Sequence, residues 1–68
     1  MLPYEEFSYV YKIITDNVNM SHDEIINILG KTYYKIYQPE IDFMIDKIKS
    51  KTNIDYTSLK GMKKLSMF

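Results

Sequence analysis

The sequence contains no cysteine, no tryptophan and no arginine, and it has only two glycines and two prolines. Without cysteine, a disulfide scaffold and a thiolate metal site are excluded. The longest strictly apolar run is three residues, 43–45, whereas a membrane-spanning helix needs about 20. The glycines stand alone at positions 30 and 61, so a glycine-rich phosphate-binding loop is also excluded. These absences point away from secreted disulfide proteins, membrane spans and nucleotide-binding enzymes.

The chain has 68 residues, of which 46% are hydrophobic, as in an ordinary folded domain. We expect a single helical domain over 1–68, since Rossmann and barrel enzymes need far more chain. The first six residues are acidic where a secretory signal is basic. We therefore expect a cytoplasmic protein, or one in the host cytoplasm if a phage encodes it, with no membrane association.

Charge is distributed unevenly along a chain whose formal net charge is zero. Residues 1–30 carry one lysine against five acidic residues, a net charge of −4. Residues 31–68 carry eight lysines against four acidic residues, a net charge of +4. Such polarity is typical of a basic face that meets a polyanion, or of two halves that pair with each other or with a second copy.

A first helix is predicted from Pro3 onwards. Proline is favoured in the first turn of a helix, and Glu5 and Glu6 suit the positive end of the helix dipole. Asp16 and Asn17 favour an end to this helix. Its apolar residues recur at helical spacing and are expected to face the core: Phe7, Val10, Tyr11 and Ile14.

The second helix has the clearest start signal. Ser21 and Glu24 fit a capping box, in which each side chain bonds the other residue's backbone amide. Gly30 follows the last apolar residue, as a glycine at a helix C-terminus does. The predicted buried stripe of this helix is Ile25, Ile28 and Leu29.

Two further helices, or one kinked helix over 33–50, are predicted next. Thr32 is a candidate cap for a segment over 33–38, which Pro39 limits before starting a fourth helix. A break follows at 52–56, and residues 57–68 are expected to form a last helix or a frayed tail. The apolar positions of the fourth and last segments are Ile41, Met44, Ile45, Ile48, Leu59, Met62 and Leu65. The fold class is therefore all-α: a small bundle of three to five short helices, with a helix-turn-helix-like pair at about 21–38.

Residues 21–36 resemble the helix-turn-helix of small phage and bacterial regulators, of the sigma-factor-like or Myb-like type. Ile25, Leu29, Gly30 and Ile36 stand where that family places its apolar anchors and its turn glycine. The resemblance covers about a quarter of the chain. It implies a DNA-binding transcriptional regulator, encoded by a phage or mobile element, that binds as a homodimer at a pseudo-palindrome.

The same resemblance implies which side chains would face DNA. Glutamine can read adenine, and tyrosine and lysine can contact phosphates. Because arginine is absent, strong guanine readout is not expected and the preference would lean to A·T-rich sites. The candidate DNA-binding residues are Lys31, Thr32, Tyr33, Tyr34, Lys35, Tyr37, Gln38, Lys47, Lys49 and Lys51.

The seven tyrosines and five methionines support an alternative. Both residue types are favoured at protein interfaces. On this interpretation the chain is a protein-binding module, such as a phage-encoded inhibitor of a host enzyme or defence complex.

Enzyme chemistry has little support. His22 is the single histidine and falls in the first turn of a helix, where solvent exposure explains it. Asp42 and Asp46 are one helical turn apart and could hold a metal, but a solvated face explains them better. We expect no catalytic residues, no cofactor and no metal.

Overall fold

A computed structural model describes residues 2–59 of the chain. It contains four helices, α1 (Tyr4–Asp16), α2 (His22–Leu29), α3 (Lys31–Ile36) and α4 (Gln38–Lys49), and residues 56–59 form a further helical turn. The described residues include no strand, so the all-α fold class is confirmed. Met62 and Leu65, expected on a last helix, lie outside the described residues.

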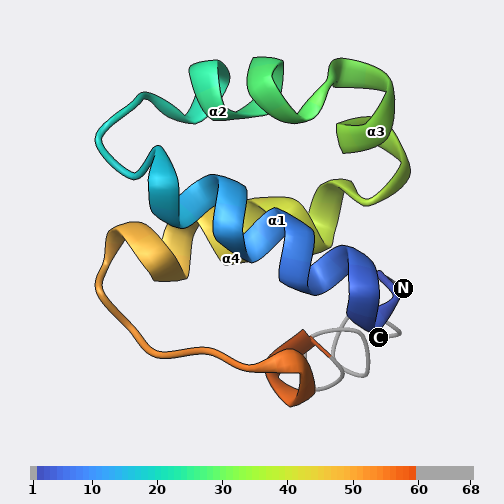
Figure 1. The fold of residues 1–68 in the computed structure, drawn as a ribbon, viewed down its shortest axis with the longest axis vertical. Coiled ribbons are helices and arrows are strands. Elements are labelled where there is room, and N and C mark those ends of the chain that lie inside the picture. The colour runs from blue at the N-terminus through green and yellow to red at the C-terminus, as the bar shows by residue number, and fades with distance from the viewer. Residues whose placement is uncertain (1, 60–68) are drawn as a thin grey trace.

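The helices are arranged around α1 and α4, which lie against each other in the middle of the molecule (Figure 1). The α2–α3 pair covers one side of these two helices, and the segment after α4 returns along the other side towards the N-terminus. No helix within residues 2–59 combines the length and the apolar content that crossing a membrane requires.

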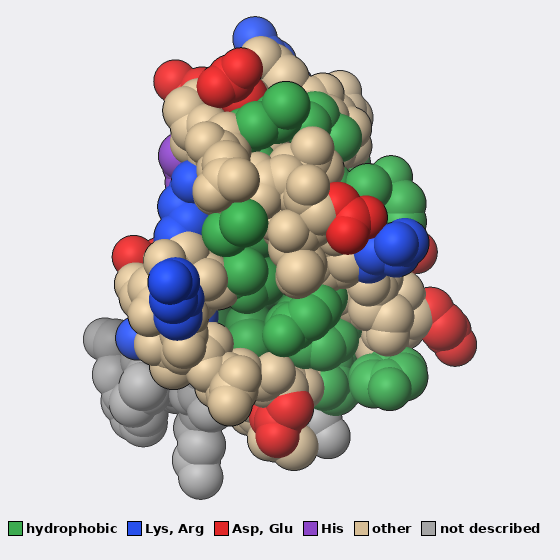
Figure 2. Space-filling model, turned by 60° about the vertical axis from the view of Figure 1, so that its left-hand side comes forward, with side chains coloured by type: hydrophobic (Ala, Val, Ile, Leu, Met, Phe, Trp, Pro, Cys, Tyr) green, Lys and Arg blue, Asp and Glu red, His purple; other side chains and the backbone are tan. Residues whose placement is uncertain are grey.

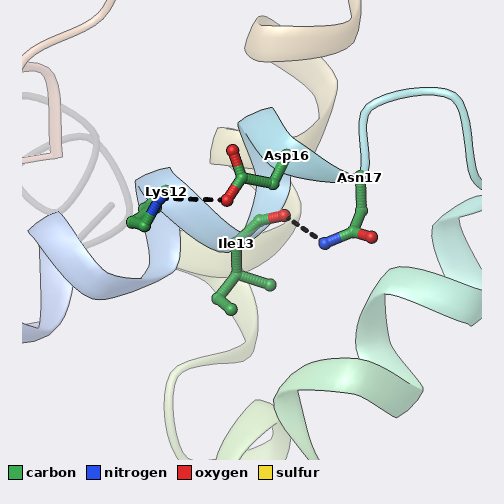
Figure 3. A network of polar contacts seen from close by, with 4 residues as sticks. All are labelled: Lys12, Ile13, Asp16 and Asn17. Atoms are coloured by element: carbon green, nitrogen blue, oxygen red, sulfur yellow. Dashed lines mark hydrogen bonds and ion pairs between the residues drawn. The ribbon is translucent and has the colours of Figure 1, made fainter.

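Helix α1 ends through a polar network (Figure 3). The Asn17 side chain donates to the Ile13 carbonyl over 2.8 Å and satisfies one of the carbonyls that a helix end leaves open. One turn away, the Lys12 ammonium lies 3.1 Å from the Asp16 carboxylate, and both side chains are largely exposed. The predicted end at Asp16 and Asn17 is confirmed, and Pro3 precedes the helix as its N-cap.

The capping box of α2 is present in both halves. The Glu24 amide donates to the Ser21 hydroxyl, and the Ser21 amide donates to the Glu24 carboxylate, each over 3.2 Å. These bonds satisfy amides that the first turn would otherwise leave unpaired.

The buried face of α2 differs from the predicted one. Ile28 is 42% exposed, whereas its neighbour Ile26 is only 8% exposed. Successive residues turn by about 100° around a helix, so the inward arc that holds Ile25, Ile26 and Leu29 leaves Ile28 on the outside. The expectation that Ile28 belongs to the core was therefore wrong.

Single residues connect α2 to α3 and α3 to α4. Gly30 adopts φ +102° and ψ 128°, in the positive-φ region where a side chain is strained, and Tyr37 joins the next two helices. The predicted cap at Thr32 was wrong, because α3 already begins at Lys31 with Gly30 as its N-cap. The choice between one kinked helix and two is settled in favour of two helices, and Pro39 lies in the first turn of α4, as expected.

The C-terminus of α4 is closed by a Schellman motif with lysine where glycine is usual. Lys51 adopts φ +61°, its amide donates to the Ile48 carbonyl, and the Thr52 amide donates to the Lys47 carbonyl. This pair of bonds is the hydrogen-bond pattern of the motif.

The core forms one cluster between the helices. Leu2 is fully buried before α1 begins, and its carbonyl accepts a 2.8 Å hydrogen bond from the Tyr56 hydroxyl, so both ends of the described chain contribute. The predicted helical spacing is confirmed at Phe7, Val10, Ile14, Ile25, Leu29, Ile41, Met44, Ile45 and Leu59.

Candidate nucleic-acid interface

The α2–α3 pair forms a corner at Gly30, and α3 presents its polar side to solvent. Lys31, Thr32 and Lys35 are exposed on α3, and Gln38 is exposed at the start of α4. Gly30 allows this corner because a residue without a side chain accepts a positive φ at little cost. The structure therefore brings four of the predicted DNA-contacting residues onto an accessible surface.

The tyrosines of this segment are placed differently from the prediction. The helix-turn-helix resemblance implied that Tyr33, Tyr34 and Tyr37 face outward towards DNA, but all three are half-buried and pack against the core. The Tyr33 and Tyr34 rings supply the apolar surface by which α3 packs on the core, since Ile36 is 64% exposed and no residue of α3 is fully buried. We infer that these tyrosines attach α3 to the rest of the molecule.

Tyr33 links α3 to α1. Its hydroxyl donates a 2.6 Å hydrogen bond to the Glu6 carboxylate, and its ring meets those of Tyr9 and Tyr37 edge-on. Burial raises the pKa of Tyr33 well above its usual value, and the bond to the Glu6 carboxylate raises it further. The Tyr33 hydroxyl thus already donates its proton to a hydrogen bond within the protein.

Asp42 joins three helices through one carboxylate oxygen. The Tyr34 hydroxyl of α3 donates to Asp42 Oδ1 over 2.7 Å, and His22 Nε2 of α2 lies 2.9 Å from the same atom. The bond to Asp42 is the main cause that raises the pKa of Tyr34 above its ordinary value. Sequence reasoning missed this contact, because 20 positions separate His22 from Asp42.

A hollow of about 340 Å³ opens between α2, α3 and the start of α4. The Ile26 side chain and the Tyr34 ring supply apolar lining, and the polar groups around them carry both signs of charge. We call this feature the α2–α3 hollow. It is lined by His22, Asp23, Ile26, Lys31, Tyr34, Lys35 and Gln38.

The three predicted lysines near the end of α4 have separate surroundings. The Lys49 ammonium donates to the Val18 and Met20 carbonyls and ties α4 to the loop between α1 and α2. The Lys47 ammonium lies 5.7 Å from the centre of the Phe43 ring. Lys51 supplies the positive-φ residue of the Schellman motif. Phosphate contacts by these lysines remain predictions, and Lys49 would have to leave its carbonyl partners to make one.

Metal binding has no geometric support in the described part of the chain. Within residues 2–59, no three histidine, aspartate or glutamate side chains come close enough together to hold a metal ion. Asp42, one of the two carboxylates considered for a metal, is bonded to Tyr34 and His22 instead.

Comparison with protein-family models, with curated proteins and with solved structures finds no match to this chain.

Proposed function

We propose that this chain is a small DNA-binding regulator that contacts nucleic acid through the α2–α3 pair. The observation that carries the proposal is the pair formed by Lys31 and Lys35. These lysines are one helical turn apart on the exposed side of α3, and neither forms an ion pair with any residue that the structure describes. Two unpaired ammonium groups beside a helix corner suit the phosphates of a nucleic-acid backbone.

The neighbouring exposed groups suit base contacts. The Gln38 amide can pair with the edge of adenine, and the Ile36 side chain, which is 64% exposed, can meet the methyl group of thymine. With no arginine for bidentate guanine contacts, the expected preference is for A·T-rich sites. Binding as a homodimer at a pseudo-palindrome is part of the same proposal.

A mobility-shift assay with short A·T-rich and G·C-rich duplexes at two or more salt concentrations tests this function. Affinity should fall linearly with the logarithm of salt concentration, because each phosphate contact releases counterions. The double variant Lys31→Gln/Lys35→Gln should reduce the slope by about 2, one for each lost contact. Lys12→Gln, which removes a lysine on α1, is the matched control and should leave the slope unchanged. Salt-independent binding, or equal slopes for the double variant and the control, would contradict DNA binding by this surface.

A second candidate function is binding to another protein, and the exposed apolar side chains favour it. Figure 2 shows hydrophobic side chains gathered in a strip over one face of the molecule, with lysines along its left side. Large contiguous hydrophobic patches on a protein surface mark sites of interaction with other proteins. Among the described residues, the large exposed hydrophobic side chains are Tyr4, Tyr9, Met20, Ile28 and Ile36.

Affinity capture from a host lysate, with and without nuclease, separates the two functions. A protein partner should survive nuclease and the double variant Lys31→Gln/Lys35→Gln, but it should be lost with Ile28→Ser/Ile36→Ser. A complex that DNA mediates should be lost after nuclease treatment and with the double variant Lys31→Gln/Lys35→Gln.

A further inference from the structure

The α2–α3 hollow combines two cations that have no internal partner. Lys31 and Lys35 both line it, and their spacing along α3 places their Cβ atoms about 5–6 Å apart. Like charges at this spacing repel each other, and within residues 2–59 neither lysine has a carboxylate partner. By contrast, Lys12 pairs with Asp16, and Lys49 bonds two carbonyls. An anion placed between Lys31 and Lys35 would remove their repulsion.

The Asp42 carboxylate, which contacts α3, is already engaged. The Asp42 oxygen that faces α3 accepts the Tyr34 hydroxyl proton and lies beside His22, so its charge is directed towards these two groups. Asp23 is the one carboxylate among the residues that line the hollow. Two lysines against one aspartate give this lining a net charge of +1 with neutral His22. A lining with this net positive charge suits one small anionic group between the two lysines.

The remaining lining favours an anion attached to an organic body. Ile26 and the Tyr34 ring supply apolar surface, and the Gln38 amide carries two N–H donors, of which one faces the Tyr34 hydroxyl. The volume of about 340 Å³ lies at the lower end of the range for small-molecule sites, about 300–1,000 Å³. We propose that the α2–α3 hollow is a binding site for one phosphate group, held between the ammonium groups of Lys31 and Lys35.

A phosphate monoester and a nucleic-acid backbone present the same chemical group. The inference rests on the proposed function where the phosphate belongs to DNA, and it extends beyond that function where the phosphate belongs to a small monoester. In the second case the ligand and DNA would use the same two lysines, so a bound monoester would compete with DNA.

The test is a titration of the full chain, followed through its backbone amide signals by NMR, with four probes: inorganic phosphate, adenosine 5′-monophosphate, adenosine and a short DNA duplex. Phosphate and the monophosphate should shift the amides of residues 22–38, whereas adenosine, which lacks the phosphate, should not. The variant Lys31→Gln/Lys35→Gln should weaken monophosphate binding by about tenfold or more. Asp23→Asn should tighten it roughly two- to fivefold, because it removes the one opposing charge. Lys12→Gln should leave it unchanged.

The outcomes separate this inference from the proposed function. Localised shifts with both phosphate probes that need Lys31 and Lys35 support the hollow as a phosphate site, even if the duplex does not bind. If the duplex binds through these lysines while the small phosphates cause no localised shift, the inference is overturned and the proposed function stands. Shifts that persist in the double variant, or that spread equally over α1, also overturn the inference. Circular dichroism of each variant confirms that the fold is retained.

Discussion

The Tyr33 hydroxyl and the Glu6 carboxylate are joined by a 2.6 Å hydrogen bond across 27 positions of the chain. This bond links α3 to the first turn of α1 and connects the proposed DNA-contacting helix to the centre of the molecule. Since α3 has no fully buried residue, such contacts determine its position.

The bond between Tyr33 and Glu6 predicts a dependence of stability on alkaline pH. The folded-state pKa of Tyr33 is raised above its ordinary value of 10.0, because burial and the Glu6 carboxylate favour the neutral hydroxyl. Its stabilising contribution should be complete below about pH 10, the unfolded pKa, and should decrease as pH rises above that value. Urea unfolding at several alkaline pH values should show a smaller decrease for Tyr33→Phe than for the unmodified chain. Tyr4→Phe, at an exposed tyrosine, is the control and should follow the unmodified chain.

The exposure of Ile28 and the burial of Ile26 predict unequal losses of stability at two isoleucines that are two positions apart. Ile26→Ala should lower the free energy of unfolding by about 2–4 kcal/mol, because it removes buried methyl groups and leaves a cavity. Ile28→Ala should cost less than about 1 kcal/mol, since its side chain is already 42% exposed. Chemical denaturation of both variants measures the difference. Equal losses would show that α2 is rotated relative to the structure described here.

Lys51 predicts a stabilising substitution. A non-glycine residue at φ +61° costs roughly 1–2 kcal/mol, and glycine avoids that cost while losing more chain entropy on folding. Lys51→Gly should therefore raise the free energy of unfolding by about 0.5–1 kcal/mol. Lys47→Gly, inside α4, should instead lower it by about 1 kcal/mol. Thermal unfolding of the two variants should give shifts of opposite sign.

Gly30 predicts a destabilising substitution at the corner between α2 and α3. An added Cβ would lie 3.9 Å from Tyr33 Cβ, an ordinary contact, so the cost of Gly30→Ala comes from the positive φ. We expect a loss of about 1–3 kcal/mol in the free energy of unfolding. Chemical denaturation of Gly30→Ala measures this loss. A neutral Gly30→Ala would contradict the described corner.

The sequence predicted those features that depend on neighbouring residues. The capping box at Ser21, the turn at Gly30 and the helix start at Pro39 are signalled within a few residues, and the structure confirms them. The buried face of α2 could not be predicted, because either Ile26 or Ile28 can join Ile25 and Leu29 on one side of so short a helix. Packing against the other helices selects between them. That packing places Ile26 inside and Ile28 outside.

The candidate site was predicted only in part for a similar reason. Lys31 and Lys35 could be identified from the sequence, because they follow the turn at Gly30 and their spacing of four places them on the same side of a helix. The contacts of Tyr33 with Glu6 and of His22 with Asp42 join distant parts of the chain, and no local pattern indicates them. The α2–α3 hollow exists only because three helices meet, so it could not be derived from α2 and α3 alone.

Only one residue connects α2 to α3, Gly30, and only one connects α3 to α4, Tyr37, so the spacing between these helices is fixed. One residue inserted at either position would turn the following helix by about 100° and move its buried face away from the core. The segment 53–55 lies outside the four helices and does not set the register of one helix against another. We therefore expect that an inserted residue is tolerated better there than in the stretch from α2 to α4, which keeps a fixed length.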